Sequence, residues 1–146
     1  LIPFGHDETM PKKRVIVSLL PQYWLDSVIP LLEGGDPERI SWTNRALKEM
    51  NSVGLGFKHE AYDLCLQILK SKATLGEQIP DMIDETDGTV CDTWAFLCPH
   101  PLGIPQPLYV KIGLLENRVS MMFFSLHIDL KGSLENAIRA YTEKNS

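Results

Sequence analysis

Cysteine is scarce in this chain, and its few occurrences follow no known pattern. The 146 residues include three cysteines, Cys65, Cys91 and Cys98, with no CxxC spacing. This small, odd number excludes a disulfide framework and predicts reduced, mostly buried thiols of a cytoplasmic protein without a disulfide-linked partner. No cysteine and histidine pairs have zinc-ligand spacing, so we expect no metal site.

Long apolar runs and an excess of basic charge are missing as well. No segment approaches the ~20 consecutive apolar residues that cross a membrane, so we expect no membrane partner. Lysine and arginine number 14 against 19 acidic residues, which gives a net charge of −5. An acidic chain is not typical of nucleic-acid-binding proteins. Any RNA-binding surface must therefore be a local patch.

The composition is that of an ordinary globular protein. Apolar residues make up 44% and charged residues 23% of the chain, which excludes wholesale disorder, collagen-like repeats and coiled-coil rods. A chain of this length forms one domain by default. Residues 1–9 lack the basic start and apolar run of a signal peptide, so we interpret them as a tail or expression remnant. Residues 10–146 are then a single α+β domain.

The order of the predicted elements supports that fold class. Apolar residues at helical spacing predict helices at 22–33, 43–53, 58–70 and 133–143. Runs rich in β-branched and aromatic residues, or with period-two alternation, predict strands at 14–20, 89–98, 108–115 and 119–129. A short extended piece is expected at 39–41 and a polar loop at 70–87. Helices first, an antiparallel meander next and a closing helix make an α+β arrangement.

Alternation along the last two strands sorts their side chains into two faces. Tyr109 and Lys111 point away from the apolar face of one strand, and Ser125 and His127 from that of the other. The apolar face of the second of these strands is expected to comprise Met122, Phe124, Leu126 and Ile128. The tight turn between the strands predicts that Lys111 pairs with Phe123 and that Tyr109 lies near Ser125. The four polar side chains should therefore share one face.

These side chains are the parts that a metal-independent ribonuclease needs. His127 can exchange a proton near neutral pH, and Lys111 can hold the charge of a phosphate. Tyr109 can donate a hydrogen bond or stack on a base. In that reaction the 2′-hydroxyl attacks the neighbouring phosphate while one group accepts a proton and another donates one. The alternative is that the polar row is only the solvated side of a sheet, as such rows usually are.

A thiol nucleophile is a weaker alternative. Cys98 lies two residues from His100 on a proline-rich loop, and Cys91 is a second candidate. A buried or incidental thiol is the favoured interpretation of these residues. No GxSxG, HExxH or Walker motif is present.

Four segments occur in an order that matches a known family. They are LLEGGDPERISWTNRALKEMNSVGLGF (31–57), IPDMIDETDGTVCDTWAF (79–96), LYVKIGLL (108–115) and MMFFSLH (121–127). Between about residues 28 and 129 the chain resembles the MqsR family, the toxins of the motility quorum-sensing regulator system. The resemblance implies a RelE-like fold, in which helices pack on a small curved antiparallel sheet. It also implies an mRNA interferase that cleaves single-stranded RNA without metal or cofactor and is neutralised by a protein antitoxin.

The functional positions of the family can be assigned to single residues of this chain. The strand tyrosine of the family corresponds to Tyr109 and the lysine two residues later to Lys111. A lysine near the end of the last strand corresponds to His127, which keeps proton transfer possible. These three residues are the predicted catalytic set. Pro80 stands where the family has another lysine, and Asp92 lies near the position of a family glutamine.

Substrate binding is assigned to Ser125, Trp94 and Asp92. The helix predicted at 133–143 lies outside the family pattern, and we expect it to shield or reshape the site. 

A second reading is a catalytically inactive protein-binding or regulatory module on the same fold. The net charge of −5 and the departures at Pro80 and Asp92 favour it. Its partner would contact Trp94, Phe96 and Tyr109.

Overall fold

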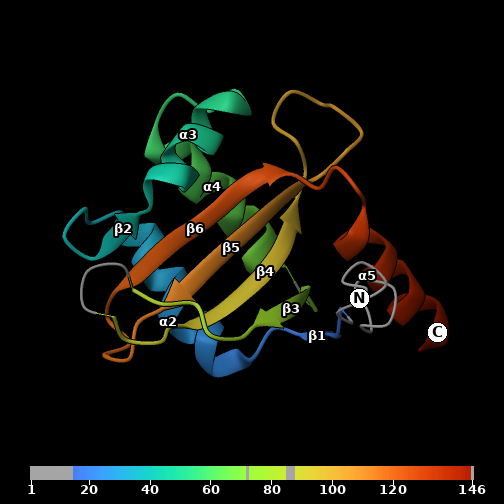
Figure 1. The fold of residues 1–146 in the computed structure, drawn as a ribbon, viewed down its shortest axis with the longest axis horizontal. Helices are drawn as coiled ribbons and strands as arrows, with labels where there is room; N and C mark the ends of the chain where they lie inside the picture. Colours follow the sequence, from blue (N-terminus) through green and yellow to red (C-terminus); the bar gives the residue numbers. More distant parts are fainter. Residues whose placement is uncertain (1–14, 72, 85–87, 146) are drawn as a thin grey trace, which may run out of the picture.

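The structure is a computed structural model that describes residues 15–71, 73–84 and 88–145. This described part forms a six-stranded open sheet with the order β1-β3-β4-β5-β6-β2, together with four helices (Figure 1). The strands are β1 (Val17–Leu19), β2 (Ile40–Trp42), β3 (Leu75–Ile79), β4 (Asp92–Cys98), β5 (Leu108–Leu114) and β6 (Met121–Ile128). The helices are α2 (Gln22–Gly34), α3 (Asn44–Ser52), α4 (Lys58–Leu69) and α5 (Ser133–Lys144).

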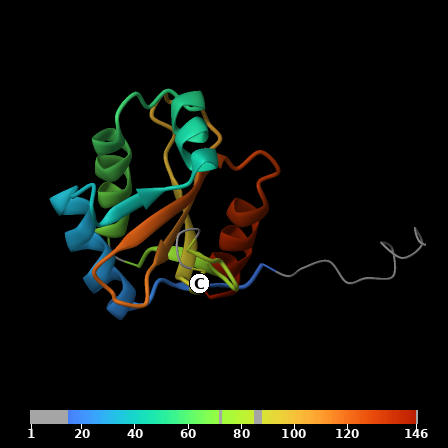
Figure 2. The same ribbon diagram turned by 60° about the vertical axis from the view of Figure 1, so that its left-hand side comes forward.

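The two faces of the sheet are covered differently. Helices α2 and α4 lie on one face, where Trp24 of α2 and Cys65 of α4 join Phe96 in the main core. Helix α5 lies on the other face, where Leu134 packs over β3 and β4 (Figure 2). On that second face the middle of β5 and β6 has no helix over it in the described chain (Figure 1). None of the helices described here has the length and apolar character of a membrane span.

The outer edge of β6 is closed by β2 and then by α3. β2 pairs with the first part of β6, from Ile40 opposite Met121 to Trp42 opposite Phe123. Thr43 then donates its backbone N–H to Phe123 and, through its side chain, caps α3 by accepting the Ala46 N–H at 3.0 Å. This cap is the one that the sequence predicts for a helix at this point. α3 therefore takes the place of a strand along the rest of the edge.

The predicted antiparallel sheet is confirmed for β4, β5 and β6 and is wrong at two places. β2 runs parallel to β6, and residues 75–79 form β3 instead of a loop. The sequence LGEQI of β3 contains a glycine and two polar residues, which gives little strand signal. Pairing with β1 on one side and β4 on the other makes this segment a strand.

A register shift in the β5–β6 pair changes the faces of β6. Lys111 pairs with Ser125 and Ile112 with Phe123, so Phe124 is an extra residue between two pairs. The predicted pairing of Lys111 with Phe123 is therefore wrong. The predicted apolar face of β6 is confirmed for Leu126 and Ile128 and wrong for Met122 and Phe124, because Met121 and Phe123 enter the main core in their place. Alternation with period two fails wherever a bulge inserts one residue.

Candidate active site

Four of the predicted site residues come together on the sheet face opposite α2 and α4. Tyr109 pairs directly with His127, and Lys111 pairs with Ser125 in the next row. The rings of Tyr109 and His127 are stacked, with centroids 5.1 Å apart and planes 17° apart. The Lys111 Nζ atom lies 5.9 Å from the centroid of the Tyr109 ring. The predicted convergence of these side chains is thus confirmed, while their chemical roles stay predictions.

The four side chains are not equally accessible. Tyr109, Lys111 and His127 are half-buried, so each presents part of its surface to solvent. Ser125 is only 2% exposed and forms part of the floor beneath them. Direct substrate binding, the role predicted for Ser125, is therefore restricted by burial.

Trp94 and Asp92, the other two predicted binding residues, lie on the opposite side of the sheet. Trp94 pairs with Ile112 of the main core and is 7% exposed. The Asp92 carboxylate accepts hydrogen bonds from the Tyr23 hydroxyl at 2.6 Å and from Trp94 Nε1 at 3.2 Å. The hydrogen bond to Asp92 also raises the pKa of Tyr23, with burial as a smaller cause. Asp92 thus anchors α2 to β4 and is not part of the Tyr109 face.

The surroundings of Tyr109 keep its hydroxyl protonated. Burial raises the pKa of Tyr109 well above its ordinary value, and the nearby charges of Glu77 and Asp129 raise it further. Arg45 acts in the opposite direction. A phenol with a raised pKa stays neutral through the neutral pH range, where it can donate a proton but is a poor proton acceptor.

The hydrogen bond of the His127 ring defines which of its nitrogens is available. Nδ1 lies 2.9 Å from the carbonyl oxygen of Ile128, and a carbonyl oxygen can only accept. Nδ1 therefore carries the proton of this hydrogen bond. Nε2 is then the nitrogen that can accept a proton from a substrate group and later return it.

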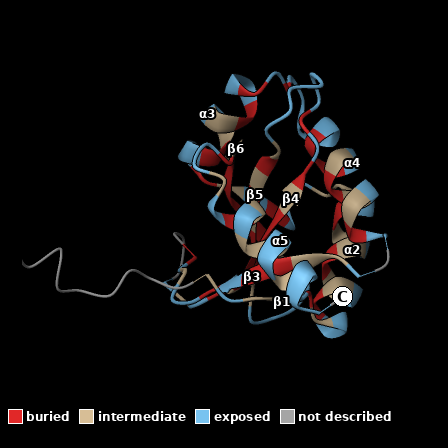
Figure 3. Cartoon of the chain, turned by 90° about the vertical axis from the view of Figure 1, so that its right-hand side faces the viewer, coloured by how far each residue is buried: buried red, intermediate tan, exposed pale blue. Residues whose placement is uncertain are grey.

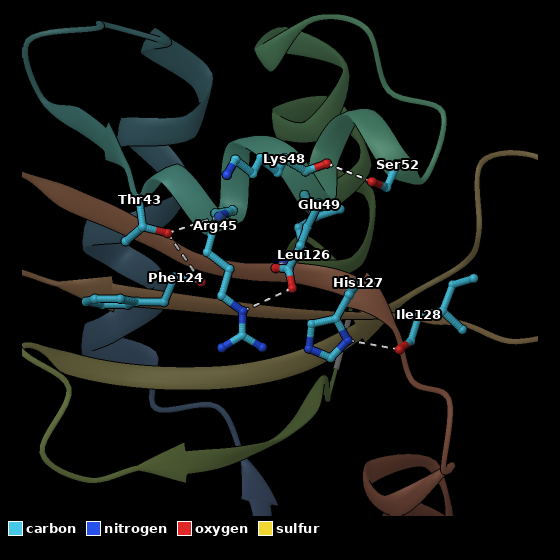
Figure 4. A network of polar contacts seen from close by, with 10 residues as sticks. Thr43, Arg45, Lys48, Glu49, Ser52, Phe124, Leu126, His127 and Ile128 are labelled. Carbon is cyan, nitrogen blue, oxygen red and sulfur yellow. Dashed lines mark hydrogen bonds and ion pairs between the residues drawn. The ribbon is translucent and has the colours of Figure 1, made fainter.

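Two further charged residues belong to this face although the sequence did not indicate them. Arg45 extends from α3 over the sheet beside His127, and its Nε atom lies 3.2 Å from Glu49 Oε2 (Figure 4). Glu77 of β3 is 8% exposed and lies in the same row as Lys111, with the small Ala95 of β4 between them. The helical pattern predicts α3 but not the strand edge on which it packs. Glu77 falls in the segment predicted as a loop.

Glu49 closes the free edge of β6 at this site, which gives a test of how the site is held. Its Oε1 accepts the backbone N–H of Leu126 at 3.0 Å (Figure 4). Glu49→Ala leaves that N–H without its partner, so we expect the free energy of unfolding to fall by about 1–3 kcal/mol. Arg45→Ala breaks the same ion pair from its exposed side and should cost at most about 1 kcal/mol. Urea denaturation of both variants measures the difference, and equal losses would contradict this role of Glu49.

The predicted thiol site is not supported by the structure. Cys65, Cys91 and Cys98 are all free and buried. A hydrogen bond to Cys98 and burial together raise the pKa of the Cys65 thiol, which makes it a poor nucleophile. Nδ1 of His100, which is itself 7% exposed, accepts the backbone N–H of Leu102. No group of three or more potential metal ligands occurs among the residues that the structure describes.

Comparisons of the chain with protein-family models, with curated proteins and with solved structures find no match. Function must therefore be inferred from the side chains of the Tyr109 face and from the resemblance in the order of the sequence segments.

Proposed function

We propose that this chain is a toxin-like endoribonuclease, an mRNA interferase that cleaves single-stranded RNA without a metal ion. The stacked pair of Tyr109 and His127, with Lys111 beside it, is the observation that carries the proposal. The pair lies on the part of the sheet face, over β5 and β6, that none of the described helices covers. It combines a proton acceptor, a proton donor and a cation, the groups that attack by a 2′-hydroxyl requires. The resemblance to the MqsR family and its RelE-like fold supports the same activity.

Each side chain takes one role in this reaction. His127 Nε2 accepts the proton of the 2′-hydroxyl as its oxygen attacks the adjacent phosphorus. Tyr109, whose hydroxyl is protonated at neutral pH, donates its proton to the departing 5′-oxygen. Lys111 and Arg45 face the extra negative charge of the pentavalent phosphate. The products are a 2′,3′-cyclic phosphate and a 5′-hydroxyl. Proton exchange with water then restores the neutral Tyr109 hydroxyl and the neutral His127 ring.

Two cations give this acidic chain a place for RNA phosphates, beside the carboxylates of Glu77, Asp129 and Glu49. The net charge is −5, yet Lys111 and Arg45 both lie at the Tyr109–His127 pair. Phosphate contacts by such cations supply most of the affinity of proteins for nucleic acids. A protein antitoxin that covers this face in the cytoplasm would hold the enzyme inactive.

The chemistry of the nucleophile provides the test. Purified protein in EDTA is mixed with a long single-stranded RNA and with single-stranded DNA of the same sequence. We expect RNA fragments that end in 2′,3′-cyclic phosphate, and intact DNA, because DNA lacks the attacking hydroxyl. Cleavage of both polymers, or of neither by folded protein, would contradict the proposal.

A non-catalytic protein-binding module is the second candidate, and the sheet edge favours it. β1 pairs only with β3 among the described strands, and the neighbouring side chains of Ile16 and Leu19 are 73% and 53% exposed. An unpaired edge of this kind can bind an extended segment of a partner. The surface predicted for this reading is wrong in part, because Trp94 and Phe96 are buried in the main core. Growth arrest on expression of the soluble protein distinguishes the interferase from the binding module.

A further inference from the structure

Glu49 of α3 uses both oxygens of its carboxylate beside the proposed active site. Oε1 accepts the backbone N–H of Leu126 at 3.0 Å, and Oε2 accepts Nε–H of Arg45, one helical turn earlier, at 3.2 Å. Helix α3 lies along β6 and carries both buried and exposed residues (Figure 3). The Glu49 side chain is 19% exposed and that of Arg45 is 69% exposed. One carboxylate therefore joins the strand of His127 to a solvent-exposed cation.

The bond to Oε2 orients the guanidinium group of Arg45. An arginine carries five N–H donors in a planar fork, and Nε–H is the one that Glu49 accepts. The four N–H groups of Nη1 and Nη2 make no hydrogen bond within the described chain. The side chain extends over the sheet beside His127 (Figure 4), and its charge acts on the Tyr109 hydroxyl. These four donors are therefore available to an anion at the Tyr109–His127 pair.

The other carboxylates at this face are placed differently. Asp129 Oδ2 accepts the backbone N–H of Glu135 at 3.1 Å, where α5 begins. Glu77 lies on β3, in the row of Lys111. Among the described residues, Arg45 has its ion pair with Glu49 alone. Because an exposed arginine otherwise samples many rotamers, Glu49 is the residue that limits where this guanidinium lies.

We propose that Glu49 is a positioning residue of the active site, which holds Arg45 so that its Nη groups meet the phosphate bound at Tyr109 and His127. The inference rests on the proposed function for the identity of this anion. Glu49 does not contact the substrate and acts through Arg45. Its own negative charge weakens the attraction of the site for phosphate, so its benefit is orientation of the fork that binds phosphate through two parallel hydrogen bonds.

Glu49→Gln separates orientation from charge. The amide keeps one oxygen for the Leu126 N–H, while its amino group cannot accept Nε–H of Arg45. Loss of a negative charge alone would speed RNA cleavage, whereas loss of orientation slows it. We expect kcat/KM to fall about threefold to fivefold, the upper range for an exposed ion pair. Arg45→Ala should lower kcat/KM at least about tenfold.

The double variant tests whether Glu49 acts through Arg45. Glu49→Gln should have no further effect on kcat/KM in an Arg45→Ala background, whereas a purely structural role would give the same loss in both backgrounds. Arg45→Lys examines the pair with Glu49 intact. It keeps the charge but lacks the planar fork, so it should also lower kcat/KM. Circular dichroism confirms that each variant is folded.

Asp36→Asn is the matched control. Asp36 lies between α2 and β2, accepts the backbone N–H of Glu38 at 2.9 Å and lies 3.8 Å from Nε of Arg39. It therefore combines the same two contacts outside the site, and its substitution should leave kcat/KM unchanged. Unchanged or faster cleavage by Glu49→Gln, equal losses with and without Arg45, or wild-type activity of Arg45→Lys would overturn the inference.

Binding of single-stranded DNA separates this inference from the proposed function. DNA of the same sequence offers the phosphates without the attacking hydroxyl, and fluorescence anisotropy at one salt concentration measures its affinity for wild type, both single variants and the double variant. Absence of RNA cleavage by the folded wild type would remove the ribonuclease. Weaker DNA binding with the same non-additive pattern would still support Glu49 as the residue that positions Arg45 for phosphate. Equal DNA affinity of all four proteins would then overturn that role as well.

Discussion

His127→Ala is expected to lower the rate of RNA cleavage by about 10²–10⁴-fold, the usual contribution of a general acid or base. The variant loses Nε2, the nitrogen left available by the hydrogen bond of Nδ1 to Ile128. Tyr109→Phe is expected to cause a loss of the same order, because it keeps the ring that stacks on His127 and removes only the hydroxyl. Initial rates on one long single-stranded RNA, with folding checked by circular dichroism, measure both effects.

Matched controls come from the same residue types outside the site. His59→Ala removes an exposed histidine that stacks on Phe57, and Tyr141→Phe alters a tyrosine of α5. Both should change the rate by less than about threefold. Because the pKa of Tyr109 is raised above its ordinary value, wild-type activity should not fall through loss of the Tyr109 proton below about pH 10. Rates of the Tyr109 and His127 variants within threefold of wild type would remove both from the mechanism.

The site residues of β5 and β4 differ in how well the sequence predicts the face on which they lie. Tyr109 and Lys111 were assigned to the correct face because β5 alternates without interruption. Trp94 and Asp92 were assigned to substrate binding, yet the pairing of β4 with β5 turns them toward the main core. Which face of a strand becomes the core depends on the layer that packs on it, and that choice is not local.

The helices were predicted closely because their ends carry local signals. The Thr43 side chain caps α3, and Gly35 adopts a left-handed conformation at the end of α2. The bulge at Phe124 and the strand β3 have no such signal, since both exist through pairing with neighbouring strands. Arg45 reaches the site from α3, which packs along β6 far from it in sequence. A single sequence predicts the elements better than the contacts between them.

Gly76→Ala should be among the most destabilising small substitutions in the chain. A Cβ atom at Gly76 would meet the carbonyl oxygen of Ala95 and lie 2.7 Å from Leu20 Cδ2. β3 is paired on both sides, so the backbone cannot move away from the Ala95 carbonyl without breaking a ladder. Overpacking of this kind typically costs 1–3 kcal/mol and sometimes more, so we expect a loss of about 3 kcal/mol in the free energy of unfolding.

Gly34→Ala provides the matched control for that substitution. Gly34 is the last residue of α2, and a Cβ atom there has nothing within 4 Å. Alanine in a helix should stabilise the protein by about 0.5–1 kcal/mol relative to glycine. Urea denaturation of both variants should therefore give changes of opposite sign. β3 also carries Glu77, which lies beside the active site. A Gly76→Ala variant that kept full stability would show that β3 is not fixed between β1 and β4 as described.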